Sequence, residues 1–169
     1  MIESIELLIE GINPQPWSAP TGSKSNFFSS DVLRDYKAAI RESIVEAFPD
    51  HPTFPKGELL TVEFYYSRSL AGGEHVADVT NMNKATEDAL QRNTRAGFRG
   101  LYYDDKNNRR VTGEIVEQSR EAELAILVRI TPYRNFKTGI FGFARFQMPE
   151  GPPIPGNVRM VTRTREETP

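Results

Sequence analysis

Residues 59–67 read LLTVEFYYS, a stretch in which apolar positions alternate with more polar ones. Successive side chains of a β-strand point to opposite faces, so this alternation predicts a strand with one buried face. Residues 4–12 and 123–130 carry the same pattern, loosely in the first case and clearly in the second. Residues 110–118 complete the set, and we expect them to form a strand paired with 123–130.

Two helices are expected among these strands. From Asp31 onward, apolar residues recur at three- and four-residue steps, which gives a helix one buried stripe. Ser30 is the expected N-cap, and the prolines that follow residue 48 end this helix. A second helix is expected from about Thr80 to Arg92, with Asp78 or Thr80 as its cap. The apolar stripe of the first helix consists of Leu33, Tyr36, Ile40 and Ile44.

The order of these elements predicts an α+β fold, a mixed β-sheet with two main helices packed on it. We assign residues 1–131 to a single domain and residues 132–169 to a C-terminal extension. The extension is expected to be partly irregular, because prolines crowd it and a charged tail ends it. Shorter strands are expected at Phe27–Phe28 and within Gly139–Phe146.

The composition fits a folded domain, since 38% of the 169 residues are hydrophobic. The chain has no cysteine, which excludes disulfides, thiolate nucleophiles and thiolate zinc sites. The N-terminus lacks the basic start and apolar run of a signal peptide, and no stretch approaches the roughly 20 apolar residues of a membrane span. We therefore expect a cytoplasmic protein without a membrane partner.

The formal net charge is −2, with a pI near 5.8. A nucleic-acid binder is usually basic overall, because Lys and Arg replace the counterions released from phosphates. Any DNA-binding function therefore requires a local basic patch in this chain. No Ser-His-Asp arrangement and no phosphate-cradling glycine motif stands out.

The stretch richest in chemistry, residues 78–90, reads DVTNMNKATEDAL. In a helix, Asn81, Lys84 and Asp88 fall on one face, and Asp78 lies just before the first turn. Carboxylates that converge repel one another unless a cation neutralises them, and Mg²⁺ prefers such oxygen ligands. The alternative interpretation is plainer: Lys84 and Asp88 form a surface ion pair, and Asp104 and Asp105 belong to a solvated hairpin.

The pattern Asp-x-x-Asn-x-x-Lys-x-x-x-Asp-Ala-Leu, followed by an aromatic run that ends in Asp104-Asp105, resembles the signature of the RusA family of Holliday junction resolvases. The resemblance covers about residues 4–130. It implies a Mg²⁺-dependent endonuclease, with Mn²⁺ as a possible substitute, that acts as a homodimer on four-way DNA junctions. The small size favours a phage or prophage type.

The resemblance also implies roles for individual residues. The catalytic residues would be Asp78, Lys84 and Asp105. The metal ligands would come from Asp78, Asp88, Asp104 and Asp105. DNA contacts are expected from Arg68, Asn81, Lys106 and Arg109. We expect the carboxylates of Asp78, Asp88 and Asp105 to lie within roughly 4 to 8 Å of one another, as shared Mg²⁺ coordination requires.

One position departs from the family pattern Asp-x-Asp-Asn, because its second Asp falls on Thr80. A threonine hydroxyl carries no charge for Mg²⁺, so either Glu63 or Glu87 substitutes, or the site is weakened. In the second case the protein holds branched DNA or a protein partner without cutting. An unrelated α+β domain is the remaining alternative. Trp17 lies among prolines, where packing is the favoured interpretation and docking of a partner the alternative.

Overall fold

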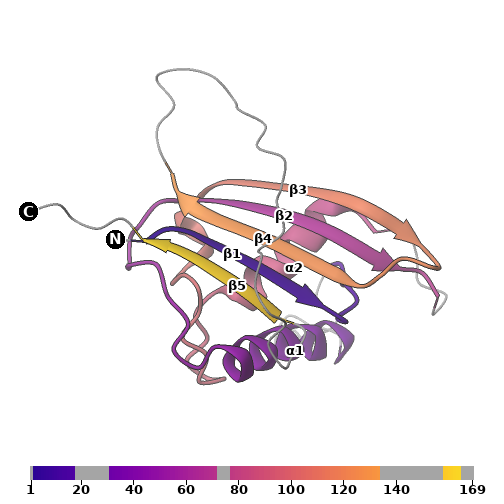
Figure 1. Cartoon of the computed structure of the whole chain (residues 1–169), viewed down its shortest axis with the longest axis horizontal. Helices are drawn as coiled ribbons and strands as arrows, with labels where there is room; N and C mark the ends of the chain where they lie inside the picture. Colours follow the sequence, from indigo (N-terminus) through magenta and orange to yellow (C-terminus); the bar gives the residue numbers. More distant parts are fainter. Residues whose placement is uncertain (1, 18–30, 72–76, 134–157, 165–169) are drawn as a thin grey trace, which may run out of the picture.

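The computed structural model describes residues 2–17, 31–71, 77–133 and 158–164. Within these ranges the chain forms one mixed sheet, two α-helices and a short 3₁₀ turn (Figure 1). The elements in chain order are β1 (Ile2–Glu10), α1 (Asp31–Ala47), β2 (Leu60–Ser69), α2 (Val79–Leu90), the 3₁₀ turn η1 (Asp105–Asn107), β3 (Asn108–Ser119), β4 (Ala125–Pro132) and β5 (Val158–Thr164).

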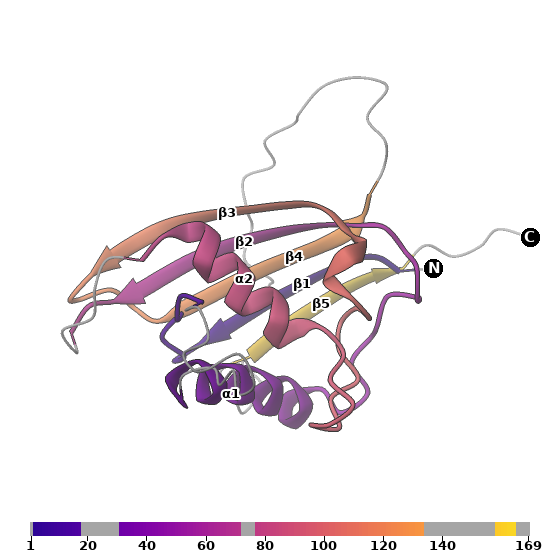
Figure 2. The same ribbon diagram turned by 180° about the vertical axis from the view of Figure 1, so that it is seen from behind.

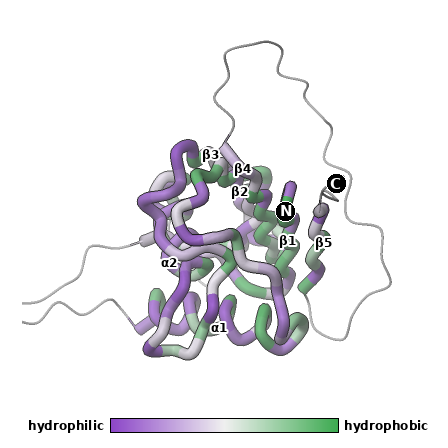
Figure 3. The backbone as a smooth tube through the Cα atoms, turned by 90° about the vertical axis from the view of Figure 1, so that its left-hand side faces the viewer, coloured by the Kyte–Doolittle hydropathy of each residue, from purple (hydrophilic) through white to green (hydrophobic). Residues whose placement is uncertain are grey.

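The sheet has the strand order β3-β2-β4-β1-β5. Strand β2 runs parallel to β3 and antiparallel to β4, and β1 runs antiparallel to both β4 and β5. Both helices cover the same face of the sheet, α2 over the β3 side and α1 towards β5 (Figure 2). An end-on view shows the sheet and the helices as two layers (Figure 3). The α+β class expected from the sequence is confirmed.

The core lies between these two layers. On β2 the buried residues alternate with half-buried ones, as the sequence pattern predicts. Apolar side chains from β1, β2 and β4 meet the buried stripe of α1, which is the one predicted from the sequence. Met82, Ala85, Ala89 and Leu90 face the core from α2. Burial of these side chains supplies the main driving force for the fold.

The expected pairing of residues 110–118 with 123–130 is wrong. These residues form β3 and β4, and β2 lies between them because it pairs with both. The reason is the connection through α2: a parallel neighbour of β2 requires a crossover, and α2 supplies it. The crossover therefore carries the chain over the sheet and returns it at the outer edge of β2.

Part of the expected C-terminal extension belongs to the sheet. Residues 158–164 form β5, which pairs with β1 along its length, so the structural unit does not end at residue 131. The expected strands at Phe27–Phe28 and Gly139–Phe146, and the expected cap Ser30, lie outside the described residues. Among the helices of the described ranges, none is both long and apolar enough to cross a membrane.

Candidate functional site

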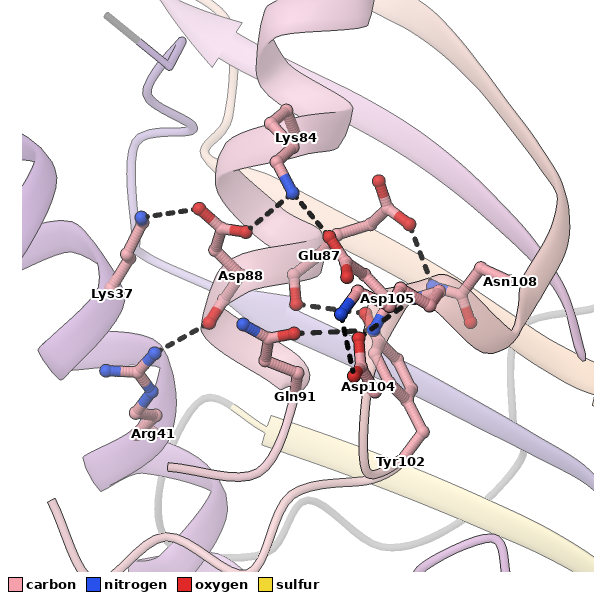
Figure 4. Close-up of polar contacts among 11 residues, drawn as sticks. Lys37, Arg41, Lys84, Glu87, Asp88, Gln91, Tyr102, Asp104, Asp105 and Asn108 are labelled. Carbon is pink, nitrogen blue, oxygen red and sulfur yellow. Dashed lines mark hydrogen bonds and ion pairs between the residues drawn. The ribbon is translucent and has the colours of Figure 1, made fainter. Parts of the chain in front are cut away.

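Lys84 lies at the centre of a chain of alternating charges (Figure 4). Its Nζ is 3.0 Å from Oδ1 of Asp88, one turn further along α2, and 2.5 Å from Oδ2 of Asp105 in η1. The other oxygen of Asp88, Oδ2, accepts a hydrogen bond of 2.8 Å from Lys37 on α1. Three separate segments therefore bring two ammonium groups and two carboxylates into one row.

The Lys84 ammonium stays protonated in this row. Partial burial alone would lower its pKa, but the hydrogen bonds to Asp105 and Asp88 outweigh burial and hold the pKa above its ordinary value. A lysine in this state cannot serve as a general base. It can serve as a fixed positive charge beside a phosphate.

The loop after α2 returns the chain so that Asp105 reaches Lys84. Leu101 N donates to Leu90 O, and Arg92 N donates to Tyr102 O, which closes residues 91–102 on themselves. The Tyr102 hydroxyl then donates to the backbone oxygen of Glu87 at 2.9 Å. This loop therefore brings Asp105, which is distant from Lys84 in the sequence, next to it in the site.

Glu87 is a buried carboxyl group beside the same charges. It is 9% exposed, and Asn108 Nδ2 donates to its Oε1 at 2.8 Å. Burial raises the pKa of Glu87, and the negative charges of Asp105 and Asp88 raise it further, against the Asn108 hydrogen bond and the charge of Lys84. A cation between Glu87 and Asp105 would relieve this repulsion.

Of the two residues expected as possible replacements for the missing Asp, Glu87 lies at the site and Glu63 does not. Tyr66 on β2 donates its hydroxyl to Thr86 of α2, so positions of β2 that differ from 66 by an even number face the helices. Glu63 differs from it by an odd number and faces away from α2. Only Glu87 of the pair can therefore act with Lys84.

Two described carboxylates near Lys84, those of Glu87 and Asp105, are candidate ligands for a hard cation. The amide oxygen of Asn108 is not, because Asn108 turns its Nδ2 to Glu87 and its oxygen away from it. Mg²⁺ is commonly bound through one or two carboxylates and completes its shell with water and substrate phosphate. Within the described ranges, no group of three or more His, Asp or Glu residues could hold a metal ion.

Asp78 stands apart from this cluster, which corrects the expected convergence. It is the N-cap of α2, where its Oδ1 accepts hydrogen bonds from the backbone N–H groups of Thr80 (2.7 Å) and Asn81 (3.3 Å). Asp88 lies ten residues further along, and a rise of 1.5 Å per residue separates the two by about 15 Å. Asp78 and Asp88 therefore cannot share one cation.

Asp104 also caps a helical turn. Its Oδ1 accepts a hydrogen bond of 3.1 Å from the backbone N–H of Lys106. This bond is the main reason why the pKa of the Asp104 carboxyl is lowered. Asp104 is half exposed at the edge of the cluster, so it orients η1 while its neighbour Asp105 faces Lys84.

The four residues expected to contact DNA divide into two groups. Arg68 is 2% exposed, and its guanidinium donates to Pro14 O (2.8 Å) and to Gln118 Oε1 (3.1 Å). A buried guanidinium cannot reach a DNA phosphate in this conformation, so the expected role of Arg68 is corrected to a structural one. Asn81, Lys106 and Arg109 are exposed, so burial does not prevent them from reaching DNA.

Several residues of the site escaped the sequence reasoning. Asn108 and Asn83 carry no individual signal, and their position depends on which face of α2 meets β3. Lys37 lies on α1, fifty-one residues from its partner Asp88. A signal did exist for Arg68: it continues the even-numbered buried positions of β2.

Comparison of the chain with protein-family models and with curated proteins finds no match.

Proposed function

We propose that this protein is a Mg²⁺-dependent endonuclease that nicks branched DNA, as the resemblance to RusA-family resolvases implies. One observation carries the proposal: Asp88 and Asp105 both contact the ammonium group of Lys84. All three residues belong to the signature, although Asp105 comes from a separate segment. The plain alternative of a surface pair and an unrelated hairpin does not account for this meeting.

In this proposal Glu87 and Asp105 hold Mg²⁺, and water and the substrate phosphate complete its shell. Glu87 substitutes for the Asp that the family pattern has at Thr80, whereas Asp78 is engaged in capping α2 and is not a ligand in this proposal. When bound, Mg²⁺ supplies charge for the scissile phosphate and lowers the pKa of a coordinated water.

The protein's own residues have distinct tasks. Lys84 presents a permanent positive charge to the negative charge that develops on the phosphate during attack. Asp88 orients Lys84, and Lys37 in turn orients Asp88 from the other helix. Asn108 fixes the Glu87 carboxylate through its amide nitrogen. The exposed residues Lys106 and Arg109 would contact the flanking backbone.

A four-way junction has two strands to cut, and paired nicks require two sites related by a two-fold axis. We therefore include a C₂ homodimer in the proposal.

The second candidate function is binding of branched DNA or a protein partner without cleavage. Thr80 favours it, since this residue supplies no charge where the family pattern has an Asp. The acidic net charge also favours a weaker role at DNA than that of a typical nuclease.

Replacing Thr80 by Asp distinguishes the two functions. Thr80 lines the same cavity as Lys84 and Glu87, so the new carboxylate should tighten Mg²⁺ binding, because affinity rises with the number of charged ligands. The measurement is cleavage of a synthetic four-way junction by the wild type, Thr80→Asp and Asp105→Asn.

We expect the wild type to cut, Thr80→Asp to cut at least as fast, and Asp105→Asn to be inactive. If only Thr80→Asp cuts, the natural protein is a disabled resolvase. If all three bind the junction and none cuts, the catalytic proposal fails and binding takes its place.

A further inference from the structure

Strand β3 forms one edge of the sheet (Figure 1). Among the described strands only β2 pairs with it, so its other side is the outer side of the described sheet. An edge strand offers backbone N–H and C=O groups to a further strand. The side chains along the edge decide which strand can pair there.

The regular part of this edge is short. The register of β3 against β2 shifts between residues 108 and 110 and again between residues 115 and 117, so Arg109 and Val116 are bulged. Between the two bulges, residues 110–115 pair one to one with residues 61–66. Because a bulge interrupts the ladder, a strand that joined this edge would pair within residues 110–115.

Three side chains of this stretch lie on the face of the sheet opposite the two helices. Arg110, Thr112 and Glu114 are the partners of odd-numbered positions of β2, which face away from α2. Glu114 is exposed, and Arg110 and Thr112 are half-buried. At every second residue this face therefore presents in turn a positive charge, a hydroxyl group and a negative charge.

We propose that β3 pairs with β3 of a second copy of the chain, antiparallel and centred on Thr112, so that one sheet runs through the dimer. This inference deepens the proposed function, on which its two-fold symmetry rests, by naming the surface through which the copies meet. Arg110 of one copy lies opposite Glu114 of its partner, twice by symmetry, and the two Thr112 side chains face each other. Pairs of opposite charge and pairs of threonine both stabilise antiparallel strands.

The charges select this register over its neighbours. A two-fold axis perpendicular to the sheet keeps each side chain on its own face, so one residue must lie opposite itself. An axis at Arg110 or Glu114 would place like charges opposite one another, which destabilises the pair. An axis at any other position of residues 110–115 except Thr112 would leave Arg110 and Glu114 opposite uncharged residues. Only the register centred on Thr112 forms pairs of opposite charge.

The same arrangement suits two cleavage sites. An axis perpendicular to the sheet leaves the helices of both copies on one face of the joined sheet, and α2 lies over the β3 side (Figure 2). The two Lys84 clusters therefore lie on the same side of the dimer, where both can face one junction. Arg109, which the proposed function assigns to DNA, is bulged and lies outside the paired residues.

Sedimentation velocity without DNA measures the dimer directly. We expect the wild type to dimerise at micromolar concentration and Arg110→Glu to raise the dissociation constant by about 10- to 100-fold, because both symmetric pairs become like-charged. Combining Arg110→Glu with Glu114→Arg should restore the wild-type value. Arg34→Glu is the matched control, since it makes the same change of charge at an exposed position of α1.

Single-cysteine variants report the register, because the chain has no cysteine of its own. Thr112→Cys places two thiols opposite each other, with Cβ atoms about 4.5–5.5 Å apart, and a short thiol cross-linker should join the two copies. Glu114→Cys is the control. Its two thiols lie four positions apart along the strands, about 14 Å, and the same reagent should leave the copies separate.

The outcomes separate this inference from the proposed function. If the wild type dimerises but Arg110→Glu leaves the dissociation constant unchanged, or Glu114→Cys cross-links in place of Thr112→Cys, the β3 interface is refuted and the homodimer uses another surface. If the wild type stays monomeric, the interface is refuted, and nicking of a four-way junction decides separately whether the nuclease stands. Thermal melting of each variant shows whether a lost dimer reflects unfolding, and the restored charge pair in the double variant supports the interface independently.

Discussion

Lys84→Gln is expected to lower the rate of junction cleavage by about two to three orders of magnitude, the usual effect of removing one group that stabilises transition-state charge. The substitution keeps a polar side chain, one bond shorter, and removes the ammonium that Asp88 and Asp105 share. The rate is measured in Mg²⁺ at saturating enzyme, so that weaker binding does not conceal the effect on the chemical step.

The structural cost of this substitution should be small. Lys84 is 43% exposed, and solvent screens its ion pairs, so the loss of stability is expected to stay below about 1 kcal/mol. Lys56→Gln is the matched control, because Lys56 is an exposed lysine in the turn before β2, away from the site. If Lys84→Gln cuts as fast as Lys56→Gln, Lys84 forms only a structural ion pair.

Gly100→Ala should have the largest effect on stability. Gly100 has φ +79°, and an added Cβ would lie 2.4 Å from the backbone nitrogen of Arg92 and 2.7 Å from Tyr102 O. Left-handed strain and overlap with backbone atoms together should cost about 2–4 kcal/mol, which lowers the melting temperature by roughly 5–15 °C. The same substitution should displace η1, and with it Asp105, from Lys84.

Gly97→Ala provides the control within the same loop. Gly97 also has a positive φ, +66°, but nothing lies within 4 Å of its added Cβ. It should therefore cost only the left-handed strain, about 1–2 kcal/mol, and leave cleavage unchanged below the melting transition. Equal melting temperatures for the two variants would show that the close approach at Gly100 has no energetic consequence.

The regular elements were predictable because their patterns are local. The period of two in β2 and the three- and four-residue steps in α1 each reflect one buried face, and neither depends on the rest of the chain. The pairing of β3 was not predictable from such patterns. It depends on the crossover through α2, and strand propensity carries no information about which neighbour a crossover selects.

The candidate site shows the same division. The contact of Lys84 with Asp88 follows from helical spacing, and the approach of Asp105 follows from the family resemblance. The separation of Asp78 from Asp88 could have been predicted, because ten helical residues place the two about 15 Å apart. The role of Glu87 needed the structure, because its burial depends on how α2 rotates towards β3 and Asn108.

Calorimetric titration of Mg²⁺ into the wild type, Asp105→Asn and Asp78→Asn tests the central claim most directly. We predict one Mg²⁺ site per chain in the wild type and its loss in Asp105→Asn. Asp78→Asn should keep the site, because Asn caps a helix about as well as Asp and Asp78 lies nine residues, about 13 Å along α2, before Glu87. A wild type that releases no heat of binding, or an affinity that Asp105→Asn leaves unchanged, would contradict a cation site beside Lys84.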